Sequence, residues 1–260
     1  MPPSYSKAEV QALKVLEECG LDEPTGFPIE TIIRGRGCSY EEKLLTGKEG
    51  EIVSFHDQSI ITINSGIDFT PKKRFAQAHE LGHYELHRHI LPMISDTEYN
   101  MVSWFQSNPY EKEANEFAAE FLMPTEIFKK ECNGDLEPDL IDYLSDGFDV
   151  SKTAAMLKFV KCGHVPVGLI YCKDNKMGWF KATDDFKEFI EFDYGMPPPY
   201  GTVAFEMFNT NKAYYGDERM QDVYKSCWLK LKHQEQDIMI KEFCLYVPSY
   251  NYTLSLIWLQ

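Results

Sequence analysis

The pattern of apolar residues changes along the chain near residue 164. Before this point, apolar residues mostly recur every three or four positions, the period of an amphipathic helix, and one β-branched region at residues 52–63 interrupts them. After it, short segments rich in aromatic and β-branched residues alternate with turn residues. We therefore predict an α+β protein. A mainly helical domain with a small β region should occupy residues 1–164, and a smaller antiparallel β-rich domain residues 165–260.

Several segments of the second half carry the strand pattern. They are residues 165–172, 177–181, 189–192, 202–208, 243–247 and 253–259. Large aromatic residues accompany them, namely Tyr214, Tyr215, Trp228 and Trp258. We expect these side chains to lie in a core or an interface and not in a ligand pocket, because aromatic side chains contribute mainly through buried area.

The clearest helical pattern of the first half covers residues 70–91. Thr70 can cap a helix, Pro71 suits its first position, and Pro92 would end it. Small and apolar residues recur at positions 75, 78, 82 and 86, which is helical spacing. The β-branched residues 60–63 just upstream predict a strand beside this helix.

This helix carries a His-Glu-x-x-His motif, since residues 79–83 read HELGH. His79 and His83 are four residues apart, about one helical turn, so both imidazoles face the same side. They could bind one metal ion together, and Glu80 could reach a water molecule beside it. This arrangement is typical of zinc peptidases, in which the glutamate is the general base. The alternative, a chance match on a surface helix, is disfavoured by the predicted cap and neighbouring strand.

A catalytic zinc site needs a third protein ligand, because such sites keep three protein ligands and one water. His89 stands ten residues after His79, the spacing of the metzincin class, but that class has a glycine where this chain has Leu86. A helix that continues past Leu86 would place His89 about 15 Å along the axis from His79. We therefore expect His89 to be a surface or helix-end histidine.

Glu111 is the better candidate for the third ligand. It lies in a second predicted helix, residues 109–122, which Ser107 or Asn108 can cap and which Pro124 follows. Asn, Ala and Leu at positions 115, 118 and 122 share its face, so its carboxylate stands above residues small enough to permit close approach to the first helix.

The other glutamates of this helix are predicted to lie elsewhere. Glu113 should face roughly the opposite way from Glu111, since two residues rotate a helix by about 200°. Glu116 and Glu120 are expected to be solvated.

Both helices resemble those of the ImmA/IrrE metallo-endopeptidases, the phage-immunity and radiation-response peptidases of bacteria and mobile elements. The matching residues are RFAQAHELGHYELH at 74–87 and E-x-x-AN-x-FAA-x-x-LMP at 111–124. Segments 26–30, 61–64 and 148–151 also fit, so the resemblance covers roughly residues 10–160. The departures are Ala76-Gln77 for the usual Thr-Leu, and Phe121 for Leu; neither concerns a ligand.

The resemblance implies a zincin-like catalytic domain. It implies metal ligands at His79, His83 and Glu111, with Glu80 as the base. The motif and Glu111 together predict one bound zinc ion per chain, with manganese as a substitute in some conditions. The resemblance also implies a protein substrate, which in known members is a helix-turn-helix repressor.

The net charge of −15 argues against direct binding of nucleic acid. Residues 139–145 and 152–161 have a helix-turn-helix pattern, but four aspartates at 139, 142, 146 and 149 stand against three lysines. A module that binds the DNA groove would be clearly basic. We therefore expect two scaffold helices, and an acidic surface that suits a basic protein partner.

The remaining sequence features predict a cytoplasmic protein. Residues 1–7 lack the basic start and apolar core of a signal peptide, and no apolar stretch approaches the roughly 18 residues of a membrane span. Seven cysteines without a C-x-x-C pair argue against a disulfide framework, so we expect reduced and mostly buried thiols.

These features favour a zinc-dependent endopeptidase, a metalloprotease of the hydrolase class, that cleaves a regulatory protein. A further donor should stabilise the oxyanion, and Tyr84, Tyr99, Tyr110 and His87 are candidates. Two alternatives are a metal-binding regulator that holds its partner without cutting it and a DNA-binding regulator, which the charge disfavours. Residues 165–260 would dock the substrate or regulate access.

Overall fold

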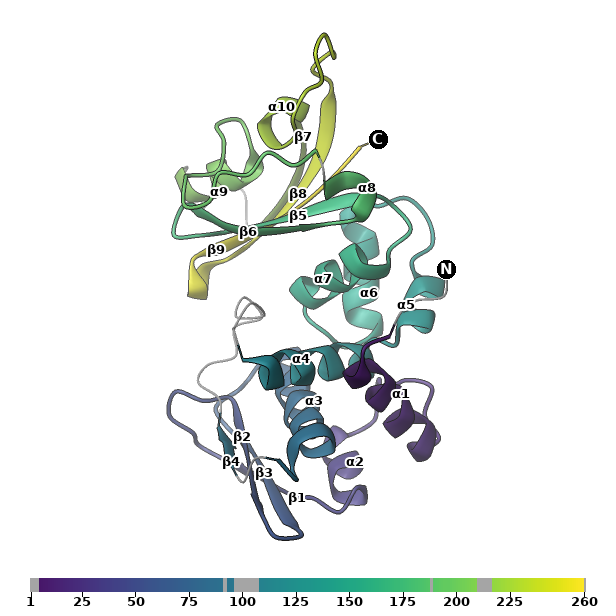
Figure 1. Cartoon of the computed structure of the whole chain (residues 1–260). Coiled ribbons are helices and arrows are strands. Elements are labelled where there is room, and N and C mark those ends of the chain that lie inside the picture. The colour runs from purple at the N-terminus through teal and green to yellow at the C-terminus, as the bar shows by residue number, and fades with distance from the viewer. Residues whose placement is uncertain (1–4, 91–92, 96–107, 188, 210–216, 260) are drawn as a thin grey trace. The chain divides into compact units, whose positions relative to one another are not determined.

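Figure 1 shows the computed structural model, which describes residues 5–90, 93–95, 108–187, 189–209 and 217–259. The chain forms two compact units. Unit 1 comprises Met1–Glu131 and Tyr143–Ala154, and unit 2 comprises Cys132–Asp142 and Ala155–Gln260. Each unit combines helices with one sheet, which confirms the α+β class. Helices α6 (Pro138–Gly147) and α7 (Lys152–Cys162) each contribute residues to both units.

Unit 1 contains a four-stranded sheet in the order β1-β3-β2-β4. Its strands are β1 (Ser39–Lys43), β2 (Gly50–Phe55), β3 (Gln58–Asn64) and β4 (Met93–Ser95). Strand β3 is parallel to β1 and antiparallel to β2, which also pairs antiparallel with β4. Strand β3 contains the predicted β-branched segment, and its residues Ile61 and Ile63 are fully buried. This sheet is the surface on which the motif helix packs.

The helices of unit 1 are α1 (Lys7–Cys19), α2 (Ile29–Gly35), α3 (Thr70–His87), α4 (Pro109–Leu122) and α5 (Thr125–Glu131). Helix α3 contacts β2, β3 and α4, and α1 packs against both α3 and α4 (Figure 1). The residues of α3 from Ala76 to Tyr84 are all buried. The motif therefore lies in the interior of unit 1, with the sheet and α4 as neighbours.

The bounds of α3 differ from the prediction at both ends. Phe69 is the N-cap residue and makes no side-chain cap bond, so Thr70 is the first helical residue and not the cap. The helix ends at His87, whereas a helix to residue 91 was expected; after His87 a turn follows, in which the N–H of Ile90 donates to the His87 carbonyl over 2.8 Å. Tight backbone turns of this kind carry no apolar period, so the pattern of residues 70–91 did not reveal it.

Helix α4 confirms most of what its sequence predicted. Asn108 is the N-cap, and its Oδ1 accepts the N–H of Tyr110 over 3.1 Å. The four residues of the predicted face, at positions 111, 115, 118 and 122, are all buried.

The expectation that Glu120 is solvated is wrong. Its side chain is fully buried, and its carboxylate accepts the N–H and the hydroxyl of Thr125 over 2.8 and 2.7 Å. The carboxylate thereby satisfies backbone and side-chain donors at the start of α5. Glu116 is half-buried and pairs with Lys112 over 3.7 Å.

Unit 2 contains a five-stranded antiparallel sheet in the order β6-β5-β9-β8-β7. Its strands are β5 (Val167–Lys173), β6 (Lys176–Ala182), β7 (Glu218–Tyr224), β8 (Met239–Val247) and β9 (Tyr252–Trp258). Four of these were predicted. The edge strand β7 was not, because its sequence ERMQDVY has little apolar alternation.

Two segments that were predicted as strands are not strands. Residues 202–208 form mostly helix α9 (Val203–Asn209), and residues 189–192 contribute only an isolated bridge between Ile190 and Leu229. The start of α9 explains the first error. The Thr202 hydroxyl accepts the N–H of Phe205 over 3.1 Å, and the Glu242 carboxylate accepts two further backbone N–H groups over 3.0 Å each. Because Glu242 comes from β8, this cap cannot be read from the local sequence.

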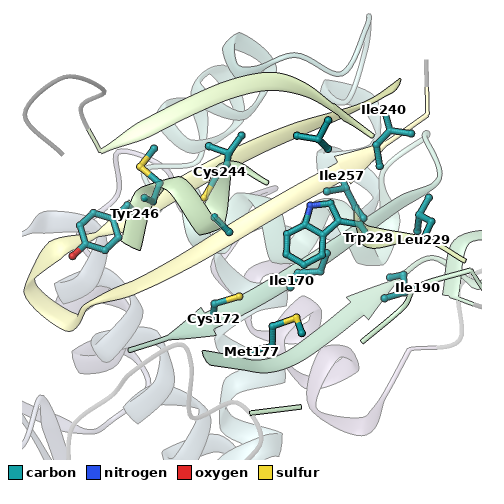
Figure 2. Close-up of a cluster of buried hydrophobic side chains, with 14 of the residues drawn as sticks. Ile170, Cys172, Met177, Ile190, Trp228, Leu229, Ile240, Cys244, Tyr246 and Ile257 are labelled. Atoms are coloured by element: carbon teal, nitrogen blue, oxygen red, sulfur yellow. The ribbon is translucent and has the colours of Figure 1, made fainter. Parts of the chain in front are cut away.

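Figure 2 shows the core of unit 2, in which the Trp228 indole lies among Ile170, Ile257 and other apolar side chains. Trp228 belongs to the short helix α10 (Lys225–Trp228) and is fully buried, and Trp258 of β9 is 5% exposed. Packing roles are therefore confirmed for these two tryptophans; Tyr214 and Tyr215 lie outside the described residues. The short helix α8 (Asp184–Lys187) and the 3-10 helix η3 (Pro248–Tyr250) complete this unit.

The fully buried Glu242 carboxylate is held by four donors. Besides the two N–H groups of α9, it accepts the Trp228 Nε1–H over 3.0 Å and the Ser255 hydroxyl over 2.8 Å. Burial raises the pKa of Glu242, against the effect of these hydrogen bonds. The contacts fix both short helices to the sheet.

All seven cysteines are free thiols, and four of them are buried, as expected: Cys38, Cys132, Cys172 and Cys244. Within the described ranges, every helix is too short or too polar to cross a lipid bilayer.

Candidate metal centre

Helices α3 and α4 bring together the three side chains that the sequence suggested as metal ligands. The Nε2 atoms of His79 and His83 are 2.8 Å apart. The Glu111 carboxylate lies 3.3 Å from the first of these nitrogens and 3.5 Å from the second. Among the described residues, these three form the one group able to hold a metal ion, with ligand atoms all within 4.8 Å of one another.

Close packing of the two helices carries Glu111 to the histidines. A Cβ atom placed on Gly82 of α3 would lie 3.1 Å from the Cβ of Phe117 in α4, closer than nearly all real contacts. The facing residues Ala114 and Ala118 are fully buried. Small residues on both helices therefore set the short distance between the motif and the carboxylate.

A hydrogen bond from α4 orients the first histidine. Nδ1 of His79 lies 2.9 Å from Oδ1 of Asn115, and this amide oxygen can only accept. Nδ1 therefore carries the proton, and the lone pair of Nε2 faces the centre. Hydrogen bonds of this kind typically fix the tautomer and ring orientation of metal-binding histidines.

The second histidine is held by two residues whose roles the sequence left open or assigned wrongly. Nδ1 of His83 lies 2.9 Å from Nδ1 of His87, and Nε2 of His87 lies 2.8 Å from the Glu113 carboxylate. His87 is 1% exposed, so it is an internal residue of the site. Glu113 does not face away from the motif helix as expected. The prediction used backbone rotation alone, and a long side chain can reach back across the helix face.

The charges of the site follow from burial and hydrogen bonding. Burial would raise the pKa of Glu111, but hydrogen bonds with His79 and His83 outweigh it, and the pKa is lowered. Burial lowers the pKa of His87, against the effect of its bond with Glu113. At neutral pH, Glu111 is therefore a carboxylate and His87 a neutral imidazole.

The donor set fits a divalent metal ion. If both Nδ1 atoms carry protons, the Nε2 lone pairs of His79 and His83 point into the same space, 2.8 Å apart, with an anionic carboxylate beside them. Such an arrangement is repulsive unless a cation neutralises it. Two imidazole nitrogens and one carboxylate oxygen form the donor set that catalytic zinc sites use in several peptidases.

Glu80 lies against the start of strand β2. The side chain is fully buried, and a Cβ atom on Gly50 would lie 2.6 Å from its Oε1 and 2.9 Å from its Cγ. Only glycine at position 50 leaves room for this carboxylate. Sequence reasoning missed Gly50, since the contact joins residues thirty positions apart and no local signal marks it.

The remaining candidates occupy different places. His89 is exposed beyond the end of α3, as a surface histidine should be. The Tyr84 hydroxyl donates to the carbonyl of Arg36 over 2.9 Å, and both ring nitrogens of His87 are engaged. The Tyr110 ring lies 5.1 Å from the His87 ring, while Tyr99 lies outside the described residues. Among the described candidates, Tyr110 thus lies next to His87, whereas the Tyr84 hydroxyl is bonded to the backbone.

Two helices and a sheet thus bring together three side chains that could hold a metal ion. Residues 36–159 match the family model of the IrrE N-terminal-like domain, a peptidase family. This match covers both motif helices and confirms that residues 36–159 resemble the ImmA/IrrE family.

One solved structure extends the comparison to the whole chain. A Mycobacterium tuberculosis transcriptional regulator is similar with a TM-score of 0.58, covering 96% of this chain and 75% of its own, at 12% sequence identity. At this identity the similarity concerns the fold alone. No curated protein matches the sequence.

Proposed function

We propose that the protein is a zinc-dependent endopeptidase with His79, His83 and Glu111 as ligands and Glu80 as general base. The observation that carries this proposal is the close approach of two imidazole nitrogens and one carboxylate, those of His79, His83 and Glu111. The buried carboxylate of Glu80 lies on the same helix as the two histidines. The peptidase family of residues 36–159 supports it.

Zinc is the metal that this donor set favours, since imidazole suits zinc and two histidines with one glutamate leave a position for water. Manganese can substitute in some conditions. A bound zinc ion would supply Lewis acidity, which acidifies a water molecule and polarises the scissile carbonyl.

Glu80 would perform the proton transfers. It accepts a proton from the attacking water as the new bond between oxygen and the carbonyl carbon forms. It then donates this proton to the amide nitrogen, whose bond to carbon breaks, and the glutamate returns to its starting state. Its burial against Gly50 limits the positions that its carboxylate can take.

The proposed substrate is a regulatory protein, in particular a basic helix-turn-helix repressor in the cytoplasm. The family supports a regulator as substrate, and the net charge of −15 favours a basic partner. The chemistry belongs to residues 1–164, because all four proposed site residues lie in unit 1. We assign substrate docking or regulation of access to residues 165–260.

A second candidate function is binding without cleavage, for which the acidic surface is the support. The discriminating experiment incubates the purified protein, with zinc or with a chelator, with repressors encoded next to its gene. Mass spectrometry of the products should show zinc-dependent cleavage at a defined bond, absent with Glu80→Gln. A stable complex with an intact repressor in the presence of zinc would support the second candidate and reject the first.

A further inference from the structure

We infer that His87 and Glu113 are positioning residues that fix the ring and the tautomer of the ligand His83. The inference rests on the proposed metal centre but does not require that the protein cleaves anything. It concerns a hydrogen-bonded line that runs from Glu113 of α4 through His87 to His83 of α3.

The chemistry of the line determines where each proton lies. A carboxylate only accepts hydrogen bonds, so Nε2 of His87 carries a proton and donates it to Glu113 over 2.8 Å. The hydrogen bond between the two Nδ1 atoms, 2.9 Å apart, needs one proton between them. When His83 binds a metal through Nε2, this proton is on Nδ1 of His83, and Nδ1 of His87 accepts it. The lone pair of His83 is then on Nε2, the atom that faces His79 and Glu111.

Because His87 is buried, water cannot readily take over its hydrogen bonds. His87 is 1% exposed, with the His83 and Tyr110 rings each 5.1 Å from its own ring. The Glu113 side chain at the outer end is 39% exposed. The line thus connects an accessible carboxylate to a buried ligand through one enclosed imidazole.

The two ligand histidines are supported unequally. His79 donates to the neutral amide of Asn115, whereas the line behind His83 ends in a carboxylate. A carboxylate partner raises the basicity of a ligand histidine. We therefore expect loss of the Glu113 charge to weaken the bond from His83 to the metal, even when the hydrogen bond itself is kept.

Zinc affinity tests this inference directly, with dissociation constants measured by competition with a chromogenic chelator. His87→Phe removes both hydrogen bonds and should raise the zinc dissociation constant by about 10–100-fold, the usual cost of losing an outer partner of a ligand. Glu113→Gln keeps an acceptor oxygen but removes the charge, and should raise the zinc dissociation constant by a smaller factor. Glu116→Gln is the matched control, because this half-buried residue of the same helix pairs with Lys112. The zinc affinity of this variant should equal that of wild type.

A double-variant cycle distinguishes positioning from general stability. If Glu113 acts through His87, Glu113→Gln should have no further effect on zinc affinity in the His87→Phe background. The visible spectrum of the cobalt-substituted protein should shift in both single variants and stay unchanged in Glu116→Gln. Thermal unfolding of the metal-free proteins shows whether each variant folds; Glu113 is partly exposed, so its variant tests the inference even if His87→Phe does not fold.

The inference is overturned if wild-type protein binds zinc and Glu113→Gln retains both its affinity and its cobalt spectrum. It is also overturned if Glu113→Gln weakens zinc binding equally with and without His87. If only the proposed peptidase function is wrong, the protein should bind zinc and the variants should change zinc affinity as expected, but no repressor should be cleaved.

Discussion

Gly50 and Glu80 show how a single backbone position can control a proposed catalytic side chain. A methyl group at position 50 would collide with the Glu80 carboxylate at 2.6 Å. We expect Gly50→Ala to displace this carboxylate and reduce cleavage by about 10²-fold, because small misplacements of catalytic groups are costly. Zinc affinity should not change, since the proposed ligands do not move. Gly35→Ala, where the new atom meets open space, is the control for both measurements.

Glu80→Gln tests the proton transfer without changing the shape of the side chain. The amide cannot accept the proton from water, so cleavage of the repressor should fall by at least about 10²-fold, the scale of general-base catalysis. Elemental analysis should show that the variant retains its metal. Full activity in this variant would reject Glu80 as the base.

Glu111→Ala tests the third ligand. Removal of this carboxylate leaves two imidazoles, so elemental analysis should show a clear loss of zinc relative to wild type. The companion variant His89→Ala should keep its zinc, because His89 is exposed beyond the end of α3. Metal loss in His89→Ala with full occupancy in Glu111→Ala would reverse the two assignments.

At the scale of elements, the site depends on how closely α3 and α4 approach. An added methyl group on Gly82 would meet Phe117 at 3.1 Å, so that Phe117 or α4 would have to shift by a few tenths of an ångström. Gly82→Ala should therefore lower the free energy of unfolding by about 1–3 kcal/mol, the usual cost of overpacking a core. It should also weaken zinc binding, because Glu111 moves with α4. Chemical denaturation and chelator competition measure the two effects, and an unchanged zinc affinity would show that the ligands do not depend on this contact.

The elements that the sequence predicted well are those whose information is local. The motif spacing and the face that carries Glu111 follow from helical geometry, so α3 and α4 were expected with nearly correct positions. Helix α9 was missed because its start is stabilised by Glu242 from β8, about forty residues away in sequence. Strands β1 and β4 were also missed, since one is mostly polar and the other has three residues.

The residues of the site that were missed have the same cause as the missed helix α9, namely contacts between different elements. Gly50 contacts Glu80, and Glu113 contacts His87. Neither contact has a sequence period or a motif. Motif spacing and helical geometry suggested the three candidate ligands, but the residues that contact them are determined by packing between elements.

At the scale of the whole molecule, the two units offer separate tests of chemistry and selectivity. Glu242 accepts four hydrogen bonds in unit 2, and Glu242→Gln would leave at least one buried donor unsatisfied, at a cost of about 1–3 kcal/mol. If residues 165–260 dock the substrate, this variant should still cut an unstructured model peptide, with reduced selectivity for the repressor. Its zinc content should equal that of wild type, and metal loss would show that the second unit helps to form the centre.

Metal removal should change the stability of the protein in a way that depends on Glu111. A ligand that binds only the folded state stabilises it in proportion to the logarithm of its concentration over its dissociation constant. Chelation should therefore lower the unfolding temperature of wild type and leave that of Glu111→Ala nearly unchanged. Calorimetry with and without chelator measures this difference, and an equal decrease in both proteins would indicate a metal site elsewhere.

We propose that His79, His83 and Glu111 hold one zinc ion and leave a position for water. X-ray absorption at the zinc edge of the protein measures this ligand set. The expected result is two imidazole nitrogens at about 2.0–2.1 Å with oxygen ligands at about 2.0–2.2 Å, and loss of bound zinc in Glu111→Ala. Sulfur ligands at about 2.3 Å, or a third imidazole in place of the carboxylate oxygen, would contradict it.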